Sequence, residues 1–129
     1  METIDLVALA KEASQHAYVP YSNFPVGAAV LTKTGQVFQG CNIENVSFGL
    51  CNCGERTALF KAISEGHRDF VAIAVYAATK KPISPCGACR QVMSEFFDST
   101  AKVTLSSQNG ETVEMTVGEL LPYSFTDLT

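Results

Sequence analysis

Three cysteines and one glutamate stand in two short motifs that could hold and use a metal ion. One residue separates Cys53 from Glu55, and further along the chain Pro85 directly precedes Cys86, with Cys89 three positions later. Thiolate sulfur is a common zinc ligand, and a catalytic zinc site usually has three protein ligands and a fourth position open to water. The pattern therefore predicts a catalytic zinc site with sulfur ligands from Cys53, Cys86 and Cys89. A carboxylate next to the water, that of Glu55, would carry protons as general base and then acid.

The spacing within these motifs sets conditions on the helices that carry them. Cys86 and Cys89 are three residues apart, so they share a helix face. Proline is favoured in the first helical turn, so Pro85 should mark where that helix begins. Cys53 and Glu55 are two residues apart and cannot share a face within a helix. Both can reach one metal site only from the helix end, so we expect Cys53 at or next to an N-terminal cap.

The charge of such a site needs a positive neighbour. Zn²⁺ with three thiolate ligands carries a formal charge of 2 − 3 = −1, which makes the centre a weaker acid toward its water than one with neutral ligands. Helix N-termini supply part of the missing positive charge. Arg56 follows Cys53 by three residues and could donate to its sulfur, which makes it the better candidate for tuning the site. Arg90, next to Cys89, is a weaker candidate, and the alternative for Arg56 is an exposed helix arginine.

The composition favours one globular domain, residues 1–129, with a small substrate. The chain has 129 residues, of which 47% are hydrophobic and 17% charged, and its formal net charge is −4. Nucleic-acid binding depends on clustered Lys and Arg that neutralise phosphates, and the nine basic residues here are scattered. We therefore expect a small, nearly neutral ligand and no nucleic-acid partner.

The sequence predicts neither a membrane segment nor export. The longest apolar run, around Phe70 to Ala78, is far too short to span a bilayer. The N-terminus has no basic region followed by an apolar one. An odd number of cysteines, five, does not favour a disulfide framework. We therefore expect a protein of the reducing cytoplasm with no membrane partner.

Hydrophobic periodicity and turn residues predict an α/β fold. Helices are expected over Thr3–Ala17, Cys53–Glu65, Pro85–Phe97 and Val117–Leu121, and strands over Val26–Thr32, Val37–Ile43, Phe70–Ala78, Lys102–Ser107 and Glu111–Thr116. Two hairpins should give antiparallel pairs at the ends of the sheet, and helices between strands allow parallel crossovers in its middle. We expect a three-layer α/β/α domain with a five-stranded mixed sheet.

Two polar residues lie at the end of the second expected strand. Asn42 and Glu44 fall at its end, and alternation along a strand places them on the same side. Two polar groups that point together could bind the hydroxyls of a ligand. The alternative is the start of a solvated loop.

Taken together, these residues resemble the small, homotetrameric class of zinc-dependent cytidine deaminases, and the resemblance covers nearly the whole chain. Cys-x-Glu followed by Pro-Cys-x-x-Cys is the three-cysteine form of the zinc deaminase signature. The other matching segments are residues 20–28, 40–45, 55–58, 84–91 and 120–122, together with Phe125.

The resemblance implies a reaction, a cofactor and an assembly. The reaction is hydrolytic deamination of cytidine and 2′-deoxycytidine to uridine and 2′-deoxyuridine plus ammonia, in pyrimidine salvage. The cofactor is one zinc ion per subunit, whose bound hydroxide would attack C4 while Glu55 shuttles protons. The assembly is a homotetramer in which Phe125 enters a neighbouring active site.

The resemblance also implies roles for residues that bind the nucleoside. Asn42 and Glu44 would hold the ribose hydroxyls, and Phe24 would pack against the nucleoside. The backbones of Gly54 and Ser84 would read the edge of the pyrimidine. Position 54 is usually alanine in the family, so glycine there is a departure.

Several alternatives remain open at the level of the residues. Cys51 could be a fourth ligand and close a purely structural zinc site. Cys86 and Cys89 could form a redox pair. Among enzymes, a deaminase of a cytosine nucleoside antibiotic or analogue would share the metal site. A zinc-stabilised binding protein would hold the metal without turning over any substrate.

Overall fold

The computed structural model describes residues 4–128, which contain all the expected helices and strands in the expected order. The helices are α1 (Leu6–Ser14), α2 (Gly54–Ser64), α3 (Gly87–Phe96) and α4 (Val117–Leu120), and the strands are β1 (Val26–Thr32), β2 (Val37–Cys41), β3 (Phe70–Ala77), β4 (Phe97–Ser106) and β5 (Thr112–Thr116). A short 3₁₀ helix, η1 (Phe48–Leu50), lies between β2 and α2.

The five strands form one mixed sheet in the order β2-β1-β3-β4-β5. The two hairpins pair antiparallel, as expected. β3 and β4 pair in parallel, joined by the crossover through α3. The crossover through α2 joins β2 to β3, which are not neighbours, because β1 lies between them and is antiparallel to both. The predicted five-stranded mixed sheet is confirmed.

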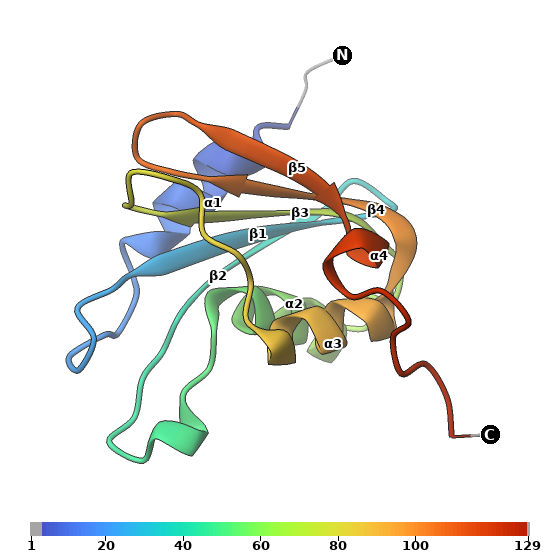
Figure 1. The fold of residues 1–129 in the computed structure, drawn as a ribbon, viewed down its shortest axis with the longest axis horizontal. Coiled ribbons are helices and arrows are strands. Elements are labelled where there is room, and N and C mark those ends of the chain that lie inside the picture. The colour runs from blue at the N-terminus through green and yellow to red at the C-terminus, as the bar shows by residue number, and fades with distance from the viewer. Residues whose placement is uncertain (1–3, 129) are drawn as a thin grey trace.

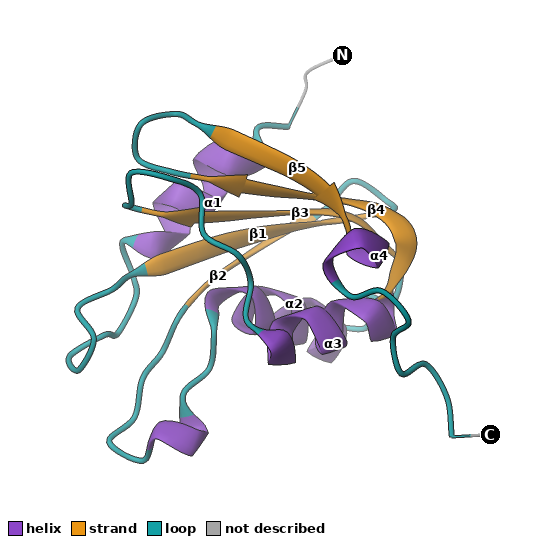
Figure 2. Ribbon diagram, in the orientation of Figure 1, coloured by secondary structure: helices purple, strands orange, loops and turns teal. Residues whose placement is uncertain are grey.

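Helices cover both faces of this sheet, which confirms the three layers. Figure 1 shows α1 on one side of the sheet and α2 and α3 on the other, and Figure 2 shows the same layers by type of structure. The larger core lies on the side of α2 and α3, where its most buried large side chains are Leu59, Ile73, Met93, Val30, Val75 and Val103. A smaller cluster on the α1 side contains Ala10, Ala29, Ala74 and Tyr76. None of the described helices is long and apolar enough to cross a bilayer.

Two glycines in the sheet let a helix come unusually close on each face. A Cβ at Gly27 would lie 1.9 Å from the carbonyl oxygen of Ala10 in α1. A Cβ at Gly40 would lie 2.3 Å from the backbone nitrogen of Ala58 and 2.9 Å from the carbonyl oxygen of Gly54, both in α2. Only glycine permits such a close backbone approach. Gly40 therefore sets how deeply the beginning of α2, which carries the first cysteine motif, sits against the sheet.

The first helix is shorter than expected. The prediction began at Thr3, which lies outside the described residues, and the structure begins the helix at Leu6. Asp5 is the N-cap, and its side chain accepts a hydrogen bond of 3.0 Å from the backbone N–H of Ala8. Aspartate is a favoured cap because its oxygen satisfies a backbone donor that the helix leaves unpaired.

The start of β4 and the 3₁₀ turn also differ from the sequence prediction. β4 begins at Phe97 instead of Lys102, because the buried ring of Phe97 packs on Phe70 with their centroids 5.6 Å apart, and the two residues pair across the strands. The intervening residues 98–100 are exposed and polar, so they resemble a loop in the sequence. The turn at Phe48–Leu50 is too short to give a periodic signal.

Candidate active site

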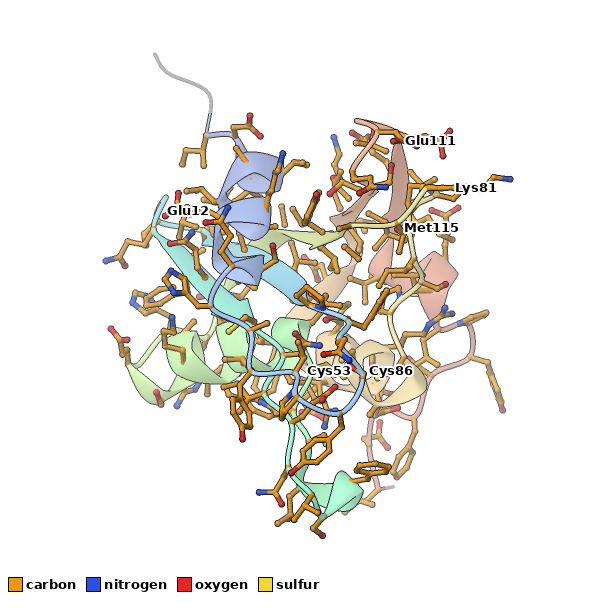
Figure 3. The ribbon with its side chains drawn as sticks, turned by 90° about the vertical axis from the view of Figure 1, so that its left-hand side faces the viewer. Glu12, Cys53, Lys81, Cys86, Glu111 and Met115 are labelled. Atoms are coloured by element: carbon orange, nitrogen blue, oxygen red, sulfur yellow. The ribbon has the colours of Figure 1, made fainter. Side chains whose placement is uncertain are left out.

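The three predicted sulfur ligands meet where the N-termini of α2 and α3 come together. Cys53 is the N-cap of α2, as the Cys-x-Glu spacing predicted, and Cys86 is the N-cap of α3. The Sγ atoms of Cys53 and Cys86 are 3.6 Å apart, and those of Cys86 and Cys89 are 3.5 Å apart. Figure 3 shows Cys53 and Cys86 next to each other. Pro85 is not in the first helical turn as expected but lies one residue before the cap.

The sulfur positions fit a zinc ion. In a tetrahedral site with Zn–S bonds of about 2.3 Å, neighbouring sulfurs lie about 3.8 Å apart. The three Sγ atoms here all lie within 4.8 Å of one another, and the cysteines are free thiols. Within the described chain, no other group of three or more His, Cys, Asp or Glu residues meets that spacing. Zinc could thus be held by Cys53, Cys86 and Cys89.

Cys51 does not join this cluster. Its Sγ atom accepts a hydrogen bond from the backbone N–H of Asn45 at 3.3 Å and donates to the carbonyl oxygen of the same residue at 3.6 Å. It thus contacts the loop that follows β2, where it lines a hollow with Tyr21 and Phe48. The structure gives no support to Cys51 as a fourth ligand.

Arg56 lies against the sulfur cluster, on the helix face that it shares with Cys53. Its Nη2 donates to the Sγ of Cys53 at 3.3 Å. A hydrogen bond from the thiol of Cys89, followed by the contact with Arg56, lowers the pKa of Cys53 to about 5. The same bond to Cys53 holds the proton on Cys89 and raises the pKa of Cys89. The thiolate of Cys53 in turn raises the pKa of Arg56, so the guanidinium stays charged.

Glu55 is a buried carboxyl group next to the cysteines. It lies in the first turn of α2 and is only 6% exposed. Burial raises the pKa of Glu55 because the low-polarity surroundings disfavour the carboxylate, and the neighbouring negative charge of Cys53 adds to this. A raised pKa suits a group that must both accept and release a proton near neutral pH.

Most of the predicted site residues line one pocket at this place. The pocket has a volume of about 210 Å³ and is lined by Phe24, Val26, Asn42, Cys53, Gly54, Glu55, Ile83, Ser84 and Cys86. Val26 and Ile83 were missed by the sequence analysis. They are apolar neighbours of the polar motifs, one at the start of β1 and the other directly before Ser84, and nothing in their type alone marks them as lining a site.

Little space is left for a side chain at Gly54. A Cβ there would lie 3.1 Å from the carbonyl oxygen of Val26 and 3.5 Å from the backbone nitrogen of Asn42. The first of these distances is tighter than an ordinary contact, so a methyl group would require Val26 to move by a few tenths of an ångström.

Asn42 and Glu44 both bind the loop that precedes β1. The side chain of Asn42 accepts from the N–H of Val26 at 2.9 Å and donates to the carbonyl oxygen of Phe24 at 2.8 Å. One oxygen of Glu44 accepts from the backbone N–H groups of Tyr21 and Ser22, both at 3.1 Å, and the other accepts from the hydroxyl of Ser22. The hydrogen bond from that hydroxyl lowers the pKa of Glu44. Asn42 lines the pocket described above, whereas Glu44 lines the separate hollow that contains Cys51.

Two further residues named in the sequence analysis lie elsewhere. Phe125 is 65% exposed and does not line the pocket of its own chain; its carbonyl oxygen accepts a hydrogen bond of 3.0 Å from the side chain of Gln91. The guanidinium of Arg90 donates hydrogen bonds to oxygen atoms of Ser84, Pro85 and Leu120 and not to sulfur. The weaker of the two arginine candidates therefore has a different place in the structure.

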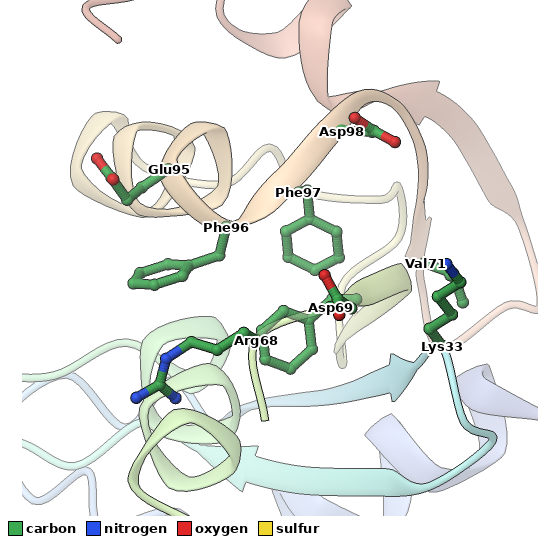
Figure 4. A pocket seen from close by; sticks show the side chains of 9 residues that line it. Lys33, Arg68, Asp69, Val71, Glu95, Phe96, Phe97 and Asp98 are labelled. Carbon is green, nitrogen blue, oxygen red and sulfur yellow. The ribbon is translucent and has the colours of Figure 1, made fainter. Parts of the chain in front are cut away.

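A larger cavity lies away from the cysteines. It has a volume of about 570 Å³ and is lined by Lys33, Arg68, Asp69, Phe70, Val71, Glu95, Phe96, Phe97 and Asp98, as Figure 4 shows. None of the predicted site residues is among them. The volume of a cavity alone therefore does not identify the candidate active site in this fold.

The sulfur geometry makes a direct prediction about metal content. Cys86→Ser removes one of the three clustered sulfurs and should leave purified protein with far less than one zinc ion per chain. Cys51→Ser is the matched control: the same chemical change, just outside the cluster, should leave the zinc content at that of the unmodified protein. Atomic absorption measures both. Loss of zinc in the Cys51 variant, or full zinc in the Cys86 variant, would contradict the ligand assignment.

Known proteins resemble the chain in both sequence and structure. Residues 1–106 match the model of the cytidine and deoxycytidylate deaminase zinc-binding region. The cytidine deaminase of Halalkalibacterium halodurans is 60% identical over 121 residues, which cover 94% of this chain and 92% of that protein. The cytidine deaminase of Sporosarcina psychrophila is 52% identical over 125 residues, covering 97% and 92%. The crystal structure of cytidine deaminase from Burkholderia pseudomallei superposes with a TM-score of 0.91 at 54% identity, covering 93% of this chain and 96% of that one. The chain therefore belongs to the zinc-dependent cytidine deaminase family.

Proposed function

We propose that the enzyme hydrolyses cytidine and 2′-deoxycytidine to uridine and 2′-deoxyuridine, releasing ammonia. The observation that carries this proposal is the buried carboxyl of Glu55 in the same pocket as two sulfurs of the three-cysteine cluster. Zinc, one ion per subunit, is the cofactor of this family, and the three sulfurs fit it. Two of the relatives described above bear the name cytidine deaminase and are more than half identical to the chain. We further infer a place in pyrimidine salvage, in the cytoplasm.

Glu55 moves the protons in this mechanism. When bound, zinc supplies the Lewis acidity that makes water a nucleophile near neutral pH. Glu55 takes one proton from the attacking water and delivers it to the ring nitrogen next to C4. It then assists transfer of the second proton to the departing amine, so that C4 gains an oxygen and ammonia leaves. A single carboxyl can serve as base and then as acid because burial keeps its pKa above the ordinary range.

The remaining residues of the pocket orient the nucleoside. The backbones of Gly54 and Ser84 read the edge of the pyrimidine, and the ring of Phe24 packs on the nucleoside. Asn42 and Glu44 hold the ribose hydroxyls. Both side chains can still bind a ligand while they bind the loop, because an amide group and a carboxylate can each make about four hydrogen bonds.

Arg56 adjusts the charge of the sulfur cluster. Its guanidinium contacts Cys53 Sγ, so it offsets part of the formal charge of −1 that three thiolates give a zinc ion. This partly restores the acidity that the water needs.

The role of Glu55 can be tested with Glu55→Gln, which keeps the shape of the side chain and removes its basicity. The variant should retain zinc and bind cytidine but lose about 10³-fold in kcat, the usual size of a general acid–base contribution. The absorbance change as cytidine becomes uridine measures turnover. Glu65→Gln, at the other end of α2, should keep wild-type rates.

The pH dependence of the same assay adds a second criterion. Because Glu55 must begin as a carboxylate, wild-type kcat/KM should fall as the pH drops through its raised pKa. Near wild-type turnover by the Gln variant would end the assignment. Turnover of a cytosine nucleoside antibiotic but not of cytidine would favour the other enzyme class. Stoichiometric zinc with no turnover of either would indicate a binding protein.

Arg56→Gln tests the charge-tuning role. The loss of a positive charge should speed zinc release to a chelator. It should also move the acidic limb of the kcat/KM profile to higher pH, because the charge of Arg56 lowers the pKa of Glu55 and its removal lets that pKa rise. Arg68→Gln provides the control, since Arg68 lies beyond the far end of α2 and binds backbone carbonyl groups. Unchanged zinc release together with an unchanged profile in the Arg56 variant would remove the role.

We also propose a homotetramer in which Phe125 enters a neighbouring active site. The support is a set of apolar side chains that a single chain leaves exposed: Val46 at 77%, Phe48 at 71%, Leu50 at 70% and Phe125 at 65%. Val46, Phe48 and Leu50 stand within five positions of the chain, and several large apolar side chains exposed in one short segment are typical of a surface that another molecule covers.

The assembly proposal predicts a mass in solution and an effect of Phe125. Light scattering should give about four times the chain mass of 13.9 kDa. Phe125→Ala should raise KM for cytidine by about tenfold, as expected when a buried aromatic contact worth about 1.4 kcal/mol is lost. Leu128→Ala, also in the exposed tail, should leave KM unchanged. A fully active monomer would refute both the tetramer and the role of Phe125.

A further inference from the structure

The side chain of Arg90 connects α3 to two other segments of the chain next to the pocket. Its Nε donates to the carbonyl oxygen of Pro85 at 2.9 Å. Its Nη1 donates to the carbonyl oxygen of Leu120 at 2.8 Å, and its Nη2 donates to the hydroxyl oxygen of Ser84 at 2.8 Å. Each nitrogen of the guanidinium thus has its own acceptor, at the short distances typical of charge-assisted hydrogen bonds.

Two of these acceptors belong to the wall of the pocket. Ser84 lines the pocket, and Pro85 directly precedes the sulfur ligand Cys86. Residues 78–86 form neither helix nor strand, so this segment has no ladder of backbone hydrogen bonds to fix it. Arg90 supplies two hydrogen bonds from the first turns of α3 to this irregular segment. It therefore restricts where Ser84 can lie relative to the cysteines.

The third acceptor belongs to the C-terminal segment. Leu120 is the last residue of α4 and stands five positions before Phe125. The neighbouring residue Gln91 holds the same segment further along, because its Nε2 donates to the carbonyl oxygen of Phe125 at 3.0 Å. α3 thus fixes the pocket wall and the course of the tail together.

We propose that Arg90 is a positioning residue for the deamination reaction, one that holds the Ser84–Pro85 wall of the pocket and the end of α4 in a fixed relation to α3. This inference rests on the proposed function, since the wall is the part that reads the pyrimidine edge. Arg90 is not among the residues that line the pocket, and its hydrogen bonds go to oxygen and not to sulfur. Its effect should therefore appear in the fit of the nucleoside more than in the chemical step.

Lysine cannot replace arginine in this role. The guanidinium presents its donors in a rigid plane, so it can reach three acceptors in different directions at once. An ammonium group keeps the charge but is a single point on a flexible stem and cannot span the three oxygens. Arg90→Lys therefore removes the connection while preserving the net charge near the site. Arg68→Lys is a matched control, because Arg68 also donates to backbone carbonyl groups, those of Ile63 and His67, but lines the distant cavity.

The test measures kcat and KM for cytidine in zinc-loaded enzyme. Arg90→Lys should raise KM by about tenfold, keep kcat within about twofold and retain one zinc ion per chain, since losing a charged hydrogen bond worth about 1.4 kcal/mol changes an equilibrium tenfold. Arg68→Lys should change neither constant. In a Ser84→Ala background the effect of Arg90→Lys on KM should be clearly smaller, because one of its acceptors is already gone.

The outcomes separate this inference from the proposed function. If the wild type turns over cytidine, any one of three results would overturn the positioning role of Arg90. These are an unchanged KM in Arg90→Lys, equal losses in kcat and zinc content, and the same increase in KM in the Ser84→Ala background. If the wild type does not turn over cytidine, the proposed function fails. Amide hydrogen exchange then still tests whether Arg90 holds the two segments in place. Exchange at residues 82–86 and 120–125 should be faster in Arg90→Lys than in Arg68→Lys, and equal rates would refute the connection.

Discussion

The meeting of two helix N-termini is the constraint on which the rest of this structure depends. Three sulfur atoms lie within 4.8 Å of one another, and as thiolates they would repel strongly without compensating charge. Cys53 caps α2 and Cys86 caps α3, so the unpaired N–H groups and the positive ends of both helix dipoles point at the cluster. Arg56 adds a full positive charge at 3.3 Å from one sulfur. The negative charge of the thiolates would therefore lie at the N-terminal end of each helix, which is the end that favours it.

The sheet brings these two helix ends together. α2 and α3 each form part of a crossover between strands, and both lie on the face of the sheet where the larger hydrophobic core is found. Gly40 lets the beginning of α2 come close to β2, at a distance that any side chain would prevent. The loops around this junction are then fixed by side chains, with Asn42 and Glu44 holding the segment before β1 and Arg90 holding the segment before α3. The pocket is thus a consequence of how the helices dock on the sheet.

Much of the site could be predicted because its information is local in the sequence. Cys53 and Glu55 are two residues apart, which required a helix cap, and Cys53 and Arg56 are three residues apart, which required a shared face; the structure shows both. The order of helices and strands followed from periodicity and turns. What could not be predicted depends on contacts between distant residues. β4 begins at Phe97 because of its packing on Phe70, and Arg90 faces oxygen atoms because Leu120 lies beside it in space.

The reaction proposed for the enzyme depends on one arrangement above all: three sulfurs would hold the zinc ion, and a light atom beside Glu55 would take its fourth position. X-ray absorption at the zinc edge of the purified enzyme measures this coordination directly. The account predicts three sulfur neighbours at about 2.3 Å and one oxygen or nitrogen neighbour at about 2.0–2.2 Å. Four sulfur neighbours, the pattern of a closed structural site, would contradict it.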